Sequence, residues 1–246
     1  MTTGRKKIVL LGMMSRMPVA GVVWQTLHYL LGFQRLGYEV YYVESHGVTP
    51  RDFFGDESDD GWRKAAAFID GALRRFDLGE HWAYRSCCDK ERSYGLNDRQ
   101  LSNLYQSADV IVNLHGGTEP LPEHYATGRL VFLETDPVEV QMQLFENCQK
   151  AINYLQPHCA FFTFGENYGS ADCELPVSGR FQFQPTRQPV LCDFWRHKAN
   201  GEADALTTIG NWRQPDRKVR LRGQEYYWSK HYEFLKFLDL PDRTRQ

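Results

Sequence analysis

Apolar runs of strand length alternate with longer segments of helical periodicity in the first part of the chain. Lys6–Gly12 is a nearly continuous apolar run, which is typical of a strand that a parallel sheet buries on both faces. Val22–Leu36 has apolar residues at helical spacing, and Gly37 is placed to end that helix. Tyr38–Glu44 is a second strand-like run. The first 45 residues therefore predict one strand–helix–strand unit.

The same alternation continues to about Gly165. Further helices are predicted at Trp62–Phe76, Asp98–Ala108 (with Asp98 as its N-cap) and Val138–Leu155. Further strands are predicted at Trp82–Ser86, Asp109–Leu114, Arg129–Glu134 and Cys159–Phe164. Strands that alternate with helices form parallel sheets, so this order predicts an α/β fold with a Rossmann-like, doubly wound, mostly parallel sheet.

Periodicity weakens after Gly165, and Gly169–Thr186 is predicted to be irregular. Shorter elements follow: a strand at Ala205–Gly210, a strand or hairpin arm at Lys218–Trp228, and a helix at Lys230–Leu238 that Ser229 caps and Pro241 stops. These elements are too few to enclose a second core. We therefore predict an N-terminal Rossmann-like domain over residues 1–185, then a linker and the beginning of an incomplete second domain over 186–246.

Composition excludes several classes of protein. The 246 residues carry 29 Lys and Arg against 31 Asp and Glu, so the formal charge is −2, and 42% of the residues are hydrophobic. This near-neutral balance argues against nucleic-acid binding. No run approaches the roughly 20 apolar residues of a membrane span. The N-terminal apolar run lacks a convincing signal-peptide cleavage site, so we expect a cytoplasmic protein.

The six cysteines form no CxxC pair, and we expect reduced thiols. Cys87 and Cys88 are adjacent, which does not favour two independent disulfides. His158 and Cys159 are also adjacent, and no pair of these residue types has zinc spacing, so no metal is predicted. A Gly-x-Ser-x-Gly elbow is absent, which argues against a hydrolase of that type.

The carboxyl ends of the predicted strands hold the candidate site, because ligands of open parallel sheets bind beyond those ends. The catalytic candidates are His115, Glu134 and Asp136. The substrate-binding candidates are Gly12, Gly21, Glu44, Gly116, Gly117, Glu166, Asn167, Asn211 and Trp212.

Each candidate also has a structural interpretation. His115 precedes two glycines, and an imidazole with a pKa near 6.5 beside open backbone suits acid–base catalysis, but a hydrogen-bonded structural histidine fits as well. Asp136 precedes Pro137 and could simply cap a helix. The Gly12–Gly21 loop has neither GxGxxG nor GK[ST] spacing, so it is weak evidence for phosphate binding. Trp212 could stack on a sugar or a base, or lie in a core.

Several segments together resemble the opening of GT-B glycosyltransferases, where a glycine-bearing loop leads into a helix and a Leu-Gly-x-Glu/His-Val turn starts the second strand. These segments are Pro18–Gly32 and Arg35–Val40. Three later segments look like a group of glycosyltransferase-like proteins within that fold: Glu134–Pro137, Pro185–Val190 and Thr208–Trp212.

The resemblance implies two facing Rossmann-like domains, of which the N-terminal one binds mainly the acceptor and the C-terminal one holds most of the nucleotide-sugar donor. By this resemblance, the chain is the acceptor-side domain with only the first strand and helix of the donor-side domain. We expect little or no transfer by these 246 residues alone. The family's donor motifs are not found here. Many inverting members carry a catalytic histidine in the first loop, but 13–21 has none, and His28 lies within the predicted helix.

Three functions are compared on this basis. The first is transfer of a sugar from a nucleotide-sugar to the hydroxyl of a small-molecule or glycan acceptor, with His115, or failing that Glu134 or Asp136, as the base or hydroxyl-orienting group. It needs no cofactor besides the nucleotide-sugar co-substrate. The second is a sugar-nucleotide epimerase, which needs no acceptor. The third is a binding or partner module without chemistry. We favour the first.

Overall fold

The computed structural model describes residues 4–46, 61–86, 93–196, 210–215 and 217–243. The chain divides into two compact units, Met1–Phe194 and Trp195–Gln246. The assignment of residues 186–246 to the start of a donor-side domain stays a prediction.

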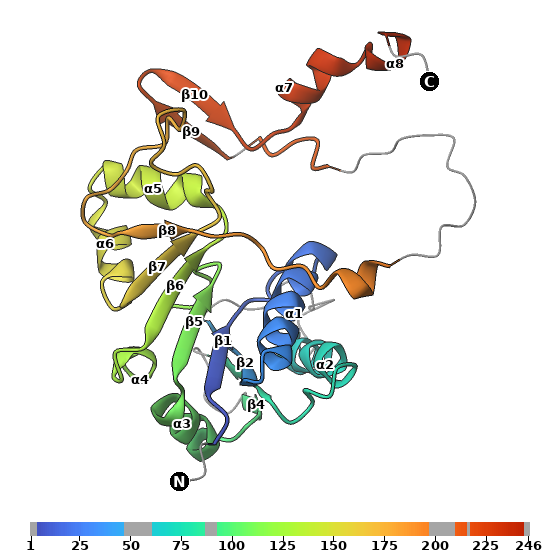
Figure 1. Ribbon diagram of the computed structural model, residues 1–246, viewed down its shortest axis with the longest axis vertical. Helices are drawn as coiled ribbons and strands as arrows, with labels where there is room; N and C mark the ends of the chain where they lie inside the picture. The colour runs from blue at the N-terminus through green and yellow to red at the C-terminus, as the bar shows by residue number, and fades with distance from the viewer. Residues whose placement is uncertain (1–3, 47–60, 87–92, 197–209, 216, 244–246) are drawn as a thin grey trace. The chain divides into compact units, whose positions relative to one another are not determined.

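The first unit is built on one eight-stranded sheet (Figure 1). The strands are β1 (Lys7–Leu11), β2 (Glu39–His46), β3 (Trp82–Ser86), β4 (Ser93–Gly95), β5 (Val110–Leu114), β6 (Leu130–Glu134), β7 (Ala160–Thr163) and β8 (Phe183–Pro185). Their spatial order is β4-β3-β2-β1-β5-β6-β7-β8, and every neighbouring pair except β3–β4 is parallel. The chain winds outward from β1 to one edge and then from β5 to the other, which confirms the predicted mostly parallel, Rossmann-like sheet.

Helices cover both faces of this sheet, and each face has its own apolar core. The α-helices among the described residues of the first unit are α1 (Ala20–Arg35), α2 (Gly61–Arg74), α3 (Asp98–Ser107), α4 (Pro122–Tyr125), α5 (Pro137–Phe145) and α6 (Gln149–Leu155). On one face α1 and α2 pack over Leu10 and Tyr42. On the other face α3 packs over Leu11 and Val43, while α5 and α6 pack around Phe132. Neighbouring residues of one strand thus contact opposite layers, as strand geometry requires.

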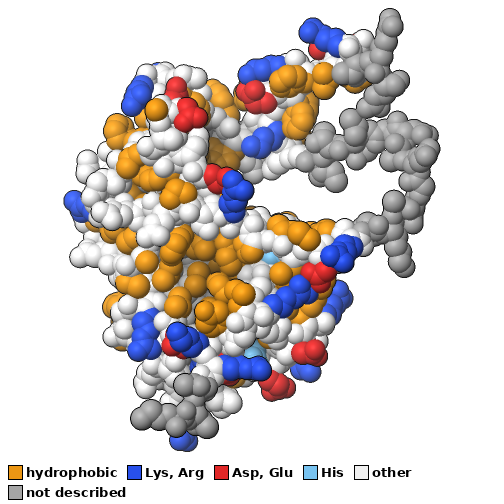
Figure 2. Space-filling view, in the orientation of Figure 1, with side chains coloured by type: hydrophobic (Ala, Val, Ile, Leu, Met, Phe, Trp, Pro, Cys, Tyr) orange, Lys and Arg blue, Asp and Glu red, His pale blue; other side chains and the backbone are white. Residues whose placement is uncertain are grey.

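Part of the α1 face has no helix over it within the described residues. A trough of about 900 Å³ lies there, bordered by α1 and floored by apolar residues of four strands: Ile8, Val110, Val112, Val131, Leu133, Ala160 and Phe162. Figure 2 shows the hydrophobic side chains that gather on this face. Parallel sheets normally bury both faces, so an open trough whose apolar floor is only partly buried is unusual.

The segment 186–194 leaves β8 and returns to α1 within the first unit. The Leu191 N–H donates to Nδ1 of His28 at 3.1 Å. Arg35 and Asp193 form a bidentate ion pair with N–O distances of 2.7 and 2.8 Å. The next residue, Phe194, packs on the ring of Trp24 with 5.8 Å between centroids. Part of the stretch predicted as a linker is therefore held against α1.

Two helix predictions in the first unit are corrected. The single helix predicted at Val138–Leu155 is two helices, α5 and α6, because Asn147 between them has a left-handed φ of 54° that ends the helical path. The N-cap of α3 is Asn97 and not Asp98. The Asn97 side chain accepts from the Gln100 N–H at 2.9 Å, and the Gln100 side chain accepts from the Asn97 N–H at 2.9 Å, which is a capping box.

The described residues of the second unit contain a two-stranded hairpin within Lys218–Trp228, where a single strand or hairpin arm was predicted, and three short helical turns. The strands β9 (Lys218–Leu221) and β10 (Gln224–Tyr227) pair in antiparallel fashion. The turns are α7 (His231–Phe234), η3 (Leu235–Phe237) and α8 (Leu240–Arg243). Pro241 lies inside α8, so the predicted stop there is wrong. Ser229 is not the cap of α7, because its hydroxyl accepts the Gln214 N–H at 2.8 Å and Lys230 holds the N-cap position.

Three other predictions need comment. The predicted irregular stretch Gly169–Thr186 contains the short strand β8. The strand predicted at Ala205–Gly210 lies, except for its last residue, outside the described residues. Cys87 and Cys88 also lie outside them, whereas the cysteines at 148, 159, 173 and 192 are free thiols.

Candidate functional site

The carboxyl ends of β1, β2, β5, β6 and β7 lie at one edge of the sheet because these strands run parallel. We call this edge the carboxyl edge. The predicted site residues that end or follow these strands are Gly12, His115, Gly116, Gly117, Glu134, Asp136, Glu166 and Asn167. Glu44 was predicted to end the second strand, but it lies within β2, which continues to His46. Gly21 is instead an exposed residue in the first turn of α1. Asn211 and Trp212 belong to the second unit.

His115 connects the ends of β5 and β6. Its φ is 65°, in the left-handed region that non-glycine residues rarely adopt and that often marks functional positions. Its backbone N–H donates to the Leu133 carbonyl at 3.1 Å, and its Nδ1 lies 2.8 Å from the Thr135 hydroxyl. Gly116 follows with φ 66°, and a Cβ there would lie 2.9 Å from the Phe132 ring. Glycine is thus required beside His115 for steric reasons.

The imidazole of His115 is neutral at physiological pH. Burial lowers its pKa to about 4, because the charged form loses hydration. Its Nε2 is buried and has no hydrogen-bond partner in the part of the chain that the structure describes. A neutral ring whose second nitrogen has no partner can accept a proton from a ligand hydroxyl or donate one to it, depending on its tautomer.

Glu134 ends β6 and is only 2% exposed. Burial raises the pKa of its carboxyl to about 7 and outweighs the hydrogen bonds from Thr163 and Gln141, which lower it. Nε2 of Gln141 lies 3.2 and 3.3 Å from the two carboxyl oxygens. A pKa near neutrality is what proton transfer at physiological pH requires.

Gln141 also connects Glu134 to the loop after β7. The Tyr168 hydroxyl donates to Oε1 of Gln141 at 2.8 Å, and the Ser178 N–H donates to the Tyr168 oxygen at 3.0 Å. This chain of hydrogen bonds joins β6, α5 and the loop after β7. Glu134 therefore positions the loop as well as presenting a titratable group.

Glu44 is fully buried and holds the loop after β1. Its carboxylate accepts from the Ser15 N–H at 2.8 Å, from the Ser15 hydroxyl, and from the Tyr42 hydroxyl at 2.5 Å. The Tyr42 oxygen in turn accepts the Met14 N–H at 2.9 Å. A Cβ on Gly12 would lie 2.5 Å from the Tyr42 ring. These contacts set the path of the loop.

The loops after β1 and β5 are in direct contact. A Cβ on Gly117 would lie 2.8 Å from the Met13 sulfur, so glycine permits this approach. Beyond β6, Asp136 occupies the N-cap position of α5 without a side-chain capping hydrogen bond, and Pro137 opens the helix. Close contacts with Phe132 at Gly116 and with Met13 at Gly117 therefore explain why both residues after His115 are glycines.

The turn after β7 is more exposed. Glu166 forms an ion pair with Arg187 at 2.5 Å, and both side chains are largely exposed. Asn167 is exposed, and its carbonyl accepts the Ser170 hydroxyl at 2.6 Å. In the second unit, Trp212 is 48% exposed and stacks on Phe234 with 5.9 Å between ring centroids.

Two polar residues of this edge, the half-buried Thr135 and the buried Asn113, are absent from the sequence-based candidates. Thr135 is the side chain that contacts the His115 ring. Asn113 is fully buried in β5, where its amide nitrogen donates to the Thr118 carbonyl and the Tyr154 hydroxyl, both at 3.0 Å. An asparagine inside the apolar run of β5 was the available signal, because buried amides need partners. Thr135 gave no comparable signal.

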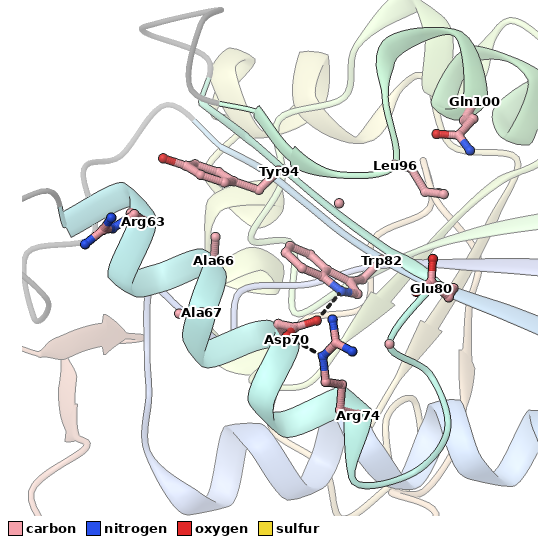
Figure 3. Close-up of a pocket in the computed structure, with 12 residues that line it drawn as sticks. Arg63, Ala66, Ala67, Asp70, Arg74, Glu80, Trp82, Tyr94, Leu96 and Gln100 are labelled. Carbon is pink, nitrogen blue, oxygen red and sulfur yellow. Dashed lines mark hydrogen bonds and ion pairs between the residues drawn. The ribbon is translucent and has the colours of Figure 1, made fainter.

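A separate cavity of about 470 Å³ lies near the amino end of β3, between α2 and β4 (Figure 3). Nε1 of Trp82 donates to Asp70 at 3.1 Å, and Asp70 also pairs with Nε of Arg74 at 2.6 Å. β2 and β1 separate β3 from β5, and none of the sequence-based candidates lines this cavity. It is therefore not part of the carboxyl edge.

No protein-family model matches the sequence, and no curated protein is significantly similar to it. Across the described ranges, no three His, Cys, Asp or Glu side chains are grouped so as to hold a metal ion. No described helix has the length and apolar character needed to cross a membrane.

Proposed function

We propose that the carboxyl edge is the acceptor-side half of a GT-B-type glycosyltransferase that moves a sugar from a nucleotide-sugar to an acceptor hydroxyl. The observation that supports this most directly is the meeting of His115 with the Glu134–Asp136 segment at the ends of two neighbouring parallel strands. Ligands bind at this edge of open parallel sheets. The sequence resemblance to GT-B enzymes supplies the reaction class.

In this proposal, His115 accepts the proton of the acceptor hydroxyl. The acceptor oxygen attacks the anomeric carbon while the bond from that carbon to the nucleotide phosphate breaks, through a transition state of oxocarbenium character. The hydroxyl proton passes to Nε2, and the leaving nucleotide keeps the bonding electron pair. A ring whose pKa is about 4 is a weak base, so we expect its contribution near the lower end of general-base catalysis, about 10²-fold.

Glu134 and Asp136 have supporting roles in this proposal. Glu134 is buried under α5 and tied to Gln141, so it fixes the turn from β6 into α5. Asp136 occupies the N-cap position of α5, where its carboxyl can orient an acceptor hydroxyl. His115 contacts Thr135, which lies between these two residues in the sequence, so the proposal assigns all three roles to neighbouring positions of the edge.

The test uses the protein expressed from its complete reading frame. It is incubated with UDP-, GDP- and ADP-sugars, with and without a mixture of hydroxyl acceptors, and released nucleotide is measured. We expect release that requires both substrates and falls about 10²-fold in His115→Gln. His81→Gln is the matched control, because His81 stacks on Tyr41 and bonds the Val40 carbonyl away from the carboxyl edge.

Three results would count against the proposal. Equal release by His115→Gln and wild type removes His115 from the chemistry. Conversion of a nucleotide-sugar without any acceptor indicates an epimerase. Absence of both turnover and binding of every nucleotide-sugar indicates a binding or partner module.

A further inference from the structure

We infer that Thr135 is a positioning residue that fixes the tautomer of His115, so that Nδ1 carries the proton and Nε2 keeps its lone pair. The catalytic consequence of this inference rests on the proposed function. The tautomer itself is a property of the folded chain and can be measured without any substrate.

The geometry restrains the His115 ring from two directions. The left-handed backbone at His115 and the hydrogen bond from its N–H to the Leu133 carbonyl fix where the side chain begins. The contact of 2.8 Å between Nδ1 and the Thr135 hydroxyl fixes which ring edge faces β6. Nε2 is the ring nitrogen that remains, and it has no partner among the described residues.

The Thr135 hydroxyl can either accept a hydrogen bond from Nδ1–H or donate one to Nδ1, and these two arrangements imply different tautomers of His115. If Nδ1–H donates to the Thr135 oxygen, Nε2 is a bare acceptor. If the Thr135 hydroxyl donates to Nδ1, Nε2 carries a buried hydrogen without an acceptor. Among buried backbone groups, unpaired donors are rarer than under-satisfied acceptors. The same preference applied to this ring favours the first arrangement.

The first arrangement also suits a proton-accepting role. When Nε2 gains a proton, Nδ1–H keeps its hydrogen bond to Thr135, so neither side chain has to turn. In the second arrangement, the proton would have to enter at Nδ1 against the existing bond. Groups that are already oriented for the charged state cost little reorganisation during the reaction. The side chain that contacts the imidazole is the Thr135 hydroxyl, which lies between Glu134 and Asp136 in the sequence.

The test is a nitrogen-15 NMR measurement of the histidine side chains at pH 7 in the 246-residue chain. The chain has eight histidines, so His115→Gln identifies the resonance of His115 by its loss. Protonated and bare ring nitrogens resonate far apart, and the pattern reports the tautomer directly. We expect Nδ1–H for His115 in the wild type and in Thr135→Ser, and a shift to Nε2–H or an averaged pattern in Thr135→Val.

Two results would overturn the inference. A wild-type His115 with its proton on Nε2 contradicts it, and this result needs no variant that might misfold. An unchanged Nδ1–H pattern in a folded Thr135→Val shows that another group sets the tautomer. The backbone spectrum of each variant, compared with the wild type, establishes that it is folded.

The transfer assay separates this inference from the proposed function. If both hold, Thr135→Val lowers kcat about tenfold with little change in KM, and Thr135→Ser restores it. Loss of transfer in His115→Gln with an unaltered tautomer in Thr135→Val keeps the proposed function and removes Thr135. The expected tautomers together with full transfer by His115→Gln keep the positioning contact and remove the proposed function.

Discussion

Replacing Glu134 by glutamine should change the pH dependence of stability. Burial raises the pKa of Glu134 from 4.5 to about 7, so the folded state holds this proton more tightly than the unfolded chain does. Stability is therefore highest below the unfolded pKa and falls as pH rises from about 4.5 towards 7. At 1.36 kcal/mol per pH unit, the difference between the two pKa values gives a loss of about 3 kcal/mol by pH 8.

Glutamine has nearly the same shape as glutamic acid but does not ionise. Near pH 5 the wild-type carboxyl is protonated, so the variant should differ only through its hydrogen bonds with Gln141 and Thr163, by about 1 kcal/mol. Near pH 8 the variant avoids the cost of a buried negative charge. We expect Glu134→Gln to be more stable than the wild type there by about 2 kcal/mol, or about 4–8 °C in Tm.

The assay is urea unfolding followed by tryptophan fluorescence at several pH values between 5 and 8. Glu146→Gln is the control, because Glu146 is exposed at the end of α5 and its charge is solvated in both states. The free energies of unfolding of wild type and Glu134→Gln, plotted against pH, should cross. Those of wild type and Glu146→Gln should run parallel. Parallel curves for Glu134→Gln would refute the argument that burial keeps this carboxyl protonated.

Three other predictions, two of them with a control substitution, test separate parts of the structure. Gly116→Ala should lower the free energy of unfolding by about 2–4 kcal/mol, because the new Cβ would meet the Phe132 ring. Gly128 has nearly the same φ but open space around it, so Gly128→Ala should lower the free energy of unfolding by only about 1 kcal/mol. Equal losses would show that crowding at Gly116 is unimportant. Tyr42→Phe should cost about 2 kcal/mol because its hydroxyl holds the loop after β1. Tyr29→Phe, whose buried hydroxyl has no partner in the described chain, should cost less than about 0.5 kcal/mol in the same denaturation experiment. Asp193→Asn should cost less than about 1 kcal/mol but speed proteolytic cleavage within 186–194, and an unchanged cleavage rate would contradict the anchoring role of its ion pair.

The central strands were predictable because each is a buried apolar run. Trp82–Ser86 matches β3 in full, and Lys6–Gly12 exceeds β1 by one residue at each end. The strand order, with β1 beside β5, was not predicted, because right-handed crossovers do not determine which strands are neighbours. Burial on both faces leaves a strong signal in the sequence because every residue of such a strand contacts an apolar layer.

Elements that depend on their neighbours were not predictable. β4 and β8 have three residues each, and such short strands are defined by the ladder beside them. The break between α5 and α6 depends on one left-handed residue, Asn147, inside an otherwise helical pattern. The final helix was predicted too long, because periodicity does not reveal where helical geometry ends without a recognisable cap.

The candidate site was predictable in position but not in its contacts. The strand-end rule placed His115 and Glu134 on adjoining strands, and the structure has them there. The rule did not reveal that Glu44 is buried and hydrogen-bonded to Ser15 and Tyr42. Nor did it reveal that Thr135 is the partner of His115, because the strand-end rule gives no information about side-chain contacts. Residue type and spacing alone carry no information about such partners.

The apolar trough over β1, β5, β6 and β7 has a practical consequence for ligand discovery. A compound that binds the folded state alone raises its melting temperature by mass action, whatever its biological relevance. Detergent monomers and other amphiphiles with apolar tails should therefore be frequent hits in a thermal-shift screen of this protein, because they can occupy the trough. Each hit should be rescreened against His115→Gln. Compounds that bind the carboxyl edge should lose their thermal shift in this variant, whereas compounds that bind the apolar trough should keep it.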